Sequence, residues 1–230
     1  MNRINFFLPL LLIILMSSCA SQIKGAVSVD SSAFFLADIS LGQRISALIR
    51  SFKSAAGQTN EIILDSHKLS QSMSAEGVSS VSLFNIGPAA VRGDVRIIDI
   101  NKFFSSKNSG KFIEFNRNGS CKITLDLNNG PDFLENLSPE ISDYLNALMA
   151  PVATGEKLTK LEYLGIVSTF YNKAISDEIA NSKITASIEF PGVITSIKGG
   201  TSSGKTAEFN ISLLDIMVLE TPLIYEVNWR

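Results

Sequence analysis

The sequence predicts an α+β fold in which an antiparallel sheet carries several helices packed on one face. Three observations predict it. Near the C-terminus apolar and polar residues alternate, which is the pattern of antiparallel strands with one buried face. In the middle of the chain Asn118-Gly119 separates two β-like runs, a strong signal for a hairpin. Elsewhere apolar residues recur at helical spacing, most clearly from Leu41 to Phe52 and from Leu158 to Ala180.

The chain begins with the pattern of an export signal. Arg3 precedes an uncharged apolar run from Phe6 to Met16, which has the length of a signal-peptide core and is too short for a membrane-spanning helix. The following Met16-Ser17-Ser18-Cys19 resembles the bacterial lipobox, whose cysteine is acylated and becomes the new N-terminus. We therefore expect residues 1–18 to be a lipoprotein signal peptide and Cys19 to carry the acyl chains. The alternative is an ordinary secretory signal with an incidental cysteine.

Residues 19–230 are expected to form a single exported α+β domain, with Gln22–Lys24 as a short N-terminal tether. Apolar residues make up 45% of the chain and charged residues 18%, which is enough apolar side chain for a core. Lys and Arg number 20 against 22 Asp and Glu, so no basic block exists to follow a phosphate backbone, and nucleic acid is excluded as a partner. With Cys19 acylated, Cys121 has no disulfide partner and is expected to be a buried, inert thiol.

The first half of the domain is expected to mix strands and short helices. In chain order we expect extended structure over 25–39 with a turn at 30–32, a helix over 41–52 that ends near Gly57, a short apolar run at 61–65, a polar helix or loop at 66–74, and two strands within 77–99 separated by Gly87-Pro88.

The second half is expected to end in strands. In chain order we expect a hairpin around 118–119, a turn at 128–132, a helix capped by Ser138 with Pro139 at its first position, a longer helix over 158–180, and strands at 184–190, 193–198, 207–213 and 223–229. Trp229, the only tryptophan, is expected to pack in the sheet although it is one residue from the chain end.

The segment 199–206 reads GGTSSGKT, which fits the phosphate-binding loop of nucleotide hydrolases. That loop works because a helix begins at the lysine and its N-terminus faces the phosphates. Here the residues after Lys205 alternate with period two and predict a strand. We therefore interpret the segment as a Gly- and Ser-rich turn and exclude nucleotide as a ligand.

No other motif indicates catalysis or a metal. His67 is the only histidine and lies in a polar segment, where a surface or capping role is expected. The stretch from Asp126 resembles a calcium loop, but its glycine is misplaced and Leu137 stands where a bidentate Glu belongs. We expect no catalytic residue, no cofactor and no metal site, so the protein is expected not to be an enzyme.

The C-terminal run from Ile184 to Trp229 resembles the end of the LppM-like bacterial lipoproteins, in which a strand ends in Pro-Gly, a glycine-bearing turn follows, and another strand leads to a late tryptophan. The stretches 83–95 and 144–156 resemble uncharacterised spirochaete lipoproteins. The first resemblance implies binding of membrane lipids and carries over no catalytic residue.

Together these features predict a lipoprotein without enzymatic activity that binds a lipid, another amphiphile or an envelope protein. It would be anchored to the bacterial envelope through Cys19, on the periplasmic face of the inner or outer membrane or on the cell surface. The alternative is a structural or assembly component of the envelope that acts through protein–protein contacts. A cavity between the 158–180 helix and the sheet would favour the first, and a filled core with an exposed apolar patch the second.

Overall fold

The computed structural model describes residues 20–106, 112–135 and 137–230, so the expected signal peptide (1–18) and Cys19 lie outside the described residues. The α+β class is confirmed: helices accompany two sheets, one with the strand order β3-β4-β2-β1-β7-β10-β9 and one with the order β5-β6-β11-β8. Neighbouring strands pair antiparallel, except that β1 and β7 are parallel.

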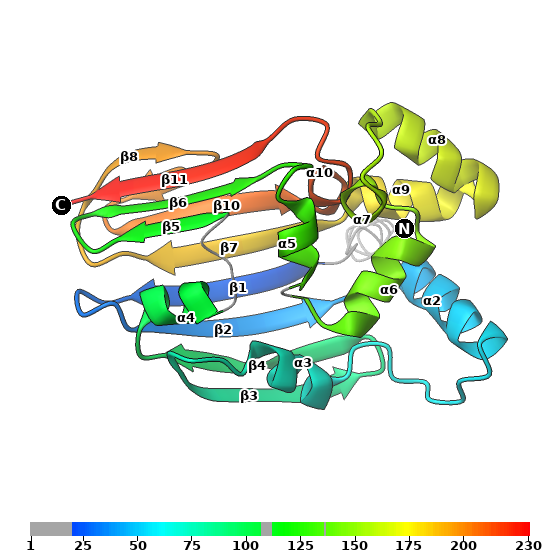
Figure 1. Cartoon of the computed structure of the whole chain (residues 1–230), viewed down its shortest axis with the longest axis horizontal. Helices are drawn as coiled ribbons and strands as arrows, with labels where there is room; N and C mark the ends of the chain where they lie inside the picture. The colour runs from blue at the N-terminus through cyan, green and yellow to red at the C-terminus, as the bar shows by residue number, and fades with distance from the viewer. Residues whose placement is uncertain (1–19, 107–111, 136) are drawn as a thin grey trace, which may run out of the picture.

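The elements follow one another closely along the chain (Figure 1). The strands are β1 Ala20–Val27, β2 Ala33–Ser40, β3 Val78–Gly87, β4 Ala90–Ile97, β5 Ile113–Asn116, β6 Ser120–Leu125, β7 Lys183–Glu189, β8 Ile194–Lys198, β9 Thr201–Ser203, β10 Thr206–Ser212 and β11 Leu223–Trp229. The helices are α2 Gln43–Ala55, α3 Ser66–Met73, α4 Ile100–Ser106, α5 Gly130–Glu135, α6 Pro139–Ala147, α7 Pro151–Thr154, α8 Lys160–Phe170, α9 Lys173–Asn181 and α10 Leu213–Val218.

The segment expected to be a tether is a strand in the middle of the larger sheet. Gln22–Lys24 lie within β1, which pairs with β2 on one side and with β7 on the other. Ile23 packs against the core between the sheets, while the side chains of Gln22 and Lys24 are exposed. The prediction of a tether was wrong because polar residues on the solvent face of a strand resemble those of a linker.

The helix expected over 158–180 is two helices. α8 starts with a capping box, in which the Thr159 hydroxyl accepts from the Glu162 N–H and the Glu162 carboxylate accepts from the Thr159 N–H. It ends at Phe170, and the side chain of Asn172 then accepts a hydrogen bond from the Ile175 N–H at 2.9 Å to start α9. An Asn that caps a new helix offers the backbone an alternative to continuing the old one.

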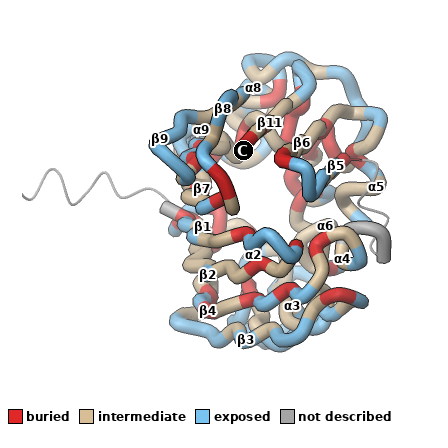
Figure 2. Tube along the Cα trace, turned by 90° about the vertical axis from the view of Figure 1, so that its left-hand side faces the viewer, coloured by how far each residue is buried: buried red, intermediate tan, exposed pale blue. Residues whose placement is uncertain are grey.

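Most helices gather at one end of the sheets. In Figure 1, α2 and α6 to α10 lie at the end at which β1 begins, while α3, α4 and α5 lie in front of the strands. The largest buried cluster is at this helical end and contains Ile49, Tyr163, Val167, Ile179 and Met217. A second cluster fills the space between the sheets, with Phe190, Phe209 and Trp229 among its members. Figure 2 shows the buried segments inside and the exposed ones outside.

Trp229 is packed as expected. Its side chain is 7% exposed, and its ring lies 4.9 Å from that of Phe190 and 5.9 Å from that of Phe115. The Trp229 N–H donates to the Gly119 carbonyl oxygen in the β5–β6 hairpin, which ties the end of β11 to the turn that Asn118-Gly119 predicted.

Candidate functional site

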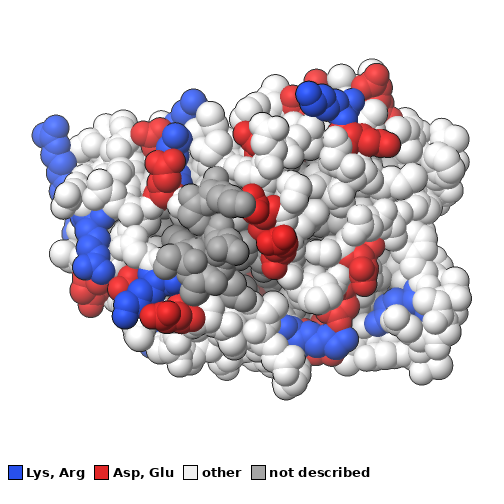
Figure 3. Space-filling model, viewed as in Figure 1, with Lys and Arg blue, Asp and Glu red and all other residues white. Residues whose placement is uncertain are grey.

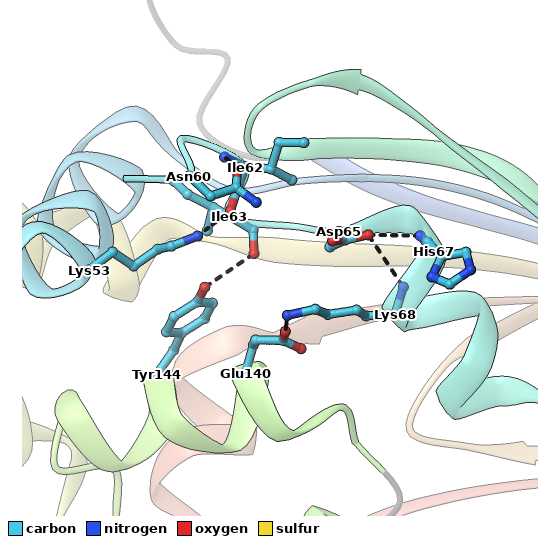
Figure 4. Close-up of polar contacts among 9 residues, drawn as sticks. All are labelled: Lys53, Asn60, Ile62, Ile63, Asp65, His67, Lys68, Glu140 and Tyr144. Atoms are coloured by element: carbon cyan, nitrogen blue, oxygen red, sulfur yellow. Dashed lines mark hydrogen bonds and ion pairs between the residues drawn. The ribbon is translucent and has the colours of Figure 1, made fainter. Parts of the chain in front are cut away.

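A polar pocket lies between the segment 57–65, which follows α2, and the N-terminal half of α6. Its volume is about 530 Å³. The lining residues that Figure 4 draws are Lys53 from α2, Asn60, Ile62, Ile63 and Asp65 from the segment, Lys68 from α3, and Glu140 and Tyr144 from α6. Gln58, Thr59 and Asp143 also line it.

The segment 57–65 is held in place through its backbone. The N–H groups of Ile63 and Leu64 both donate to the Pro88 carbonyl oxygen, at 2.7 and 3.2 Å, and the two side chains are buried in the core. The Asn60 side-chain oxygen accepts from the Ile62 N–H at 2.9 Å, and the Lys53 ammonium donates to the Ile62 carbonyl oxygen. One wall of the pocket is therefore an irregular segment with a fixed shape.

The opposite wall is α6. Tyr144 points toward the segment and its hydroxyl donates to the Ile63 carbonyl oxygen at 3.3 Å (Figure 4). Burial raises the pKa of Tyr144, and the Glu140 carboxylate raises it further, so this hydroxyl remains a proton donor at neutral pH. Glu140 forms an ion pair with Lys68 of α3, and this hydrogen bond raises the pKa of Lys68. The ion pair joins α3 to α6 at the side of the pocket.

His67 has the surface position that the sequence predicted. Its side chain is exposed at the start of α3, and its backbone N–H donates to the Asp65 carboxylate at 2.9 Å. The same carboxylate accepts from the Lys68 N–H at 3.3 Å, so Asp65 is the N-cap of α3. Among residues 20–106, 112–135 and 137–230, no three His, Cys, Asp or Glu side chains come together in a way that would hold a metal ion.

The lining suits a polar ligand with several hydroxyl or charged groups. It combines ammonium groups, carboxylates, a phenol and the side chains of Gln58, Thr59 and Asn60, so it presents donors and acceptors of both charge signs. Ile62 adds an apolar side chain that is 36% exposed. Such a mixture fits a sugar-like or zwitterionic group better than a purely anionic or apolar one.

The strand predicted after Lys205 is confirmed. Gly199–Thr206 contains the short strand β9 and a turn at Gly204-Lys205, and β10 follows at once. Gly199 and Gly204 have φ of 80° and 60°, the left-handed region that glycine adopts without strain. The Lys205 ammonium donates to the Pro191 carbonyl oxygen at 3.2 Å. The exclusion of nucleotide itself stays a prediction.

Cys121 lies in β6 with its side chain partly buried against the core between the sheets, and it is a free cysteine in the described part of the chain. Burial raises the pKa of its thiol to about 11. Since the thiolate is the reactive form, this supports the predicted inert role.

The inward faces of α8 and α9 are filled with core side chains. Tyr163, Val167 and Ile179 have no exposed surface, and the Tyr163 hydroxyl donates to the Leu148 carbonyl oxygen at 3.1 Å. The outward face of α8 is different, because Leu161 is 82% and Phe170 is 69% exposed. No cavity is therefore found between these helices and the sheet in the described residues, and a filled core with exposed apolar side chains is the arrangement expected above for the alternative role in protein–protein contacts.

Sequence reasoning missed the pocket. One wall comes from a continuous stretch, from Lys53 to Lys68, but the other comes from α6, which is far away in the chain, and none of the lining residues belongs to a motif. The one local signal was Asp65 before a polar helix, which indicates an N-cap and hence where α3 begins.

The chain was compared with protein-family models, with curated protein sequences and with solved structures. No protein-family model and no curated protein sequence matches the chain. The NMR structure of the folded domain of the Mycobacterium tuberculosis LppM protein is similar, with 10% sequence identity, coverage of 93% of this chain and 90% of that one, and a TM-score of 0.40. In the described residues, none of the helices has the length and apolar character needed to cross a membrane.

Proposed function

We propose that this chain is a lipid-anchored protein of the bacterial envelope, without enzymatic activity, whose pocket between residues 57–65 and α6 binds the polar headgroup of an amphiphile. The junction between Cys19 and Ala20 carries the proposal. The lipobox-like sequence ends at Cys19, and β1 begins at the next residue, in the interior of the seven-stranded sheet. Acyl chains on Cys19 would therefore hold the folded domain close to the membrane.

The position of the pocket supports the headgroup assignment. Apart from Lys68 in α3, the residues that line it come from α2, α6 and the segment between α2 and α3, and these elements lie toward the end of the sheets at which β1 begins (Figure 1). If the protein is anchored through Cys19, a pocket near this end lies close to the membrane surface. Because its lining is mostly polar, it suits the headgroup, while the acyl chains of the ligand stay in the bilayer.

The anchor is tested with Cys19→Ala. The wild-type protein should incorporate labelled fatty acid and partition into detergent, and the variant should do neither, because an acyl chain contributes about 0.8 kcal/mol of membrane affinity per buried methylene. Fatty-acid labelling of the variant at the wild-type level would contradict the proposal.

The pocket is tested by mass spectrometry of the lipids that co-purify with the full-length protein from its native membrane. Asp143→Lys reverses a charge on the exposed rim of the pocket, and Glu189→Lys makes the same change on the exposed face of β7. We expect Asp143→Lys to lose a lipid that wild type and Glu189→Lys both retain. Equal lipid in all three proteins would refute headgroup binding in this pocket.

A further inference from the structure

The outward face of α8 carries large apolar side chains that are exposed. This face is made of Leu158, Leu161, Glu162, Gly165, Ile166, Thr169 and Phe170. Glu162 is its one charged residue, and that carboxylate accepts hydrogen bonds from the Thr159 N–H and hydroxyl, both at 2.8 Å, at the start of the helix. In Figure 3 the charged side chains over this region lie toward the start of α8, and its outer part is white.

Packing in the core accounts for Leu158, which contacts the largest buried cluster, but not for Leu161 and Phe170. The opposite side of α8 already supplies Tyr163 and Val167 to the core, and a surface helix ordinarily carries charged and polar residues on its outward side. A single exposed leucine is unremarkable, but Leu161 and Phe170 are both largely exposed on this side, and Ile166 is partly exposed between them. Large apolar side chains that are exposed on the side of a helix away from the core indicate a second apolar environment.

A short chain of contacts links α8 to the start of β1. Ala20 is the register partner of Lys183, the first residue of β7. The preceding residue, Ser182, accepts a hydrogen bond at its carbonyl oxygen from the Leu213 N–H, which starts α10. Asp215 of α10 forms an ion pair with Lys160, the first residue of α8, at 2.5 Å. The start of α8 is thus connected to the start of β1 through β7 and α10, and both lie at the same end of the sheets (Figure 1).

From these observations we propose that the outward face of α8 lies in the interfacial region of the bilayer and is the second membrane contact of the protein. The inference rests on the proposed anchor at Cys19. The anchor fixes which end of the domain meets the membrane, and Leu161, Ile166 and Phe170 are apolar side chains that this end presents to it. Two weak contacts hold a protein on a membrane far more firmly than either alone, and they also fix its orientation.

The test measures how close single positions come to the lipid. Full-length protein is prepared with Leu161→Cys or Phe170→Cys, and with Val29→Cys or Val193→Cys as matched controls. Val29 and Val193 are 80% and 56% exposed and lie in turns at the far end of the strands. A thiol-reactive fluorophore labels the new cysteine in preference to Cys121, because burial raises the pKa of the Cys121 thiol to about 11 and keeps it in the unreactive protonated form. Labelling of the unmutated protein measures the background. Each protein is reconstituted into phosphatidylethanolamine–phosphatidylglycerol vesicles that contain lipid with a nitroxide near the headgroup.

We expect the nitroxide to quench positions 161 and 170 several-fold more than positions 29 and 193. Intact mass spectrometry of the same samples reports acylation of Cys19. If Cys19 is acylated and the protein is bound to vesicles, but position 161 is quenched no more than position 29, the α8 contact is wrong and the anchor stands. A disulfide-linked dimer through position 161 without lipid quenching would assign the face to a second copy of the chain. If Cys19 carries no acyl chain, both the anchor and the inference fail.

Discussion

Replacing Trp229 with alanine is expected to destabilise the protein by about 4 kcal/mol. A buried aromatic side chain removes about 150–250 Å² from water, which at about 25 cal/mol per Å² corresponds to roughly 4–6 kcal/mol as an upper limit. Trp229 approaches this limit because it is 7% exposed and packs against the rings of Phe115 and Phe190. Measured substitutions of buried aromatic residues by alanine cost about 3–5 kcal/mol.

The assay is urea unfolding followed by far-ultraviolet circular dichroism, since the variant has no tryptophan. Whole domains are stable by about 5–15 kcal/mol, so the loss would move the midpoint far toward zero urea. Trp229→Phe is the control, because it keeps a ring against Phe190 and should cost much less than alanine. Wild-type emission should also be blue-shifted and protected from acrylamide. A loss under about 1 kcal/mol for Trp229→Ala would refute the claim that packing of this residue holds β11 in the sheet.

Three other changes test separate parts of the structure. Lys205→Ala should change the free energy of unfolding by no more than about 0.5 kcal/mol, because the Lys205 side chain is exposed in a turn. Neither the wild-type protein nor this variant should bind nucleotide, so magnesium-dependent ATP binding that the variant loses would overturn the turn interpretation. Tyr163→Phe should cost about 1–3 kcal/mol in thermal or urea unfolding, because the buried Leu148 carbonyl oxygen loses its donor; an unchanged midpoint would contradict that hydrogen bond. Burial raises the pKa of the Cys121 thiol in the folded protein to about 11, against 9.0 for an ordinary thiol, so the stability that the protonated thiol contributes should be present below pH 9.0 and lost as the pH rises from 9.0 to about 11. A Cys121→Ala variant should lack this loss. If the free energy of unfolding depends on pH in the same way in both proteins, the burial of this thiol does not affect stability.

The strands near the C-terminus could be predicted because each has one buried and one exposed face. Phe209 points into the core while its neighbours Glu208 and Asn210 are exposed, so the sequence itself alternates. The hairpin at Asn118-Gly119 could be predicted for a local reason too, since Gly119 has a φ of 114° that other residues rarely adopt. Where a structural element is specified by a local pattern, the sequence alone was sufficient to predict it.

The errors arose where distant segments decide the structure. Gln22–Lys24 is a strand because β7, which lies far along the chain, pairs with it, and no local pattern reveals that partner. The apolar stripe of residues 158–180 continues across the break at Asn172, because α8 and α9 both face the same core. The pocket was not predicted since Lys53, Lys68 and Glu140 meet only after α2, α3 and α6 have packed.

The parallel pairing of β1 with β7 has a consequence for when the protein folds. The Thr185 hydroxyl donates to the Ser21 carbonyl oxygen, a contact between residues 164 positions apart. β1, the first strand in the described part of the chain, therefore has to wait for β7 before the larger sheet is complete, and such non-local pairing is slow because a long loop must close first. During that interval the edge of β1 that β7 later covers is unpaired. In a chain with this order of assembly the larger sheet stays incomplete until β7 is made, and an incomplete fold is easier to unravel and thread through a narrow channel than a finished one.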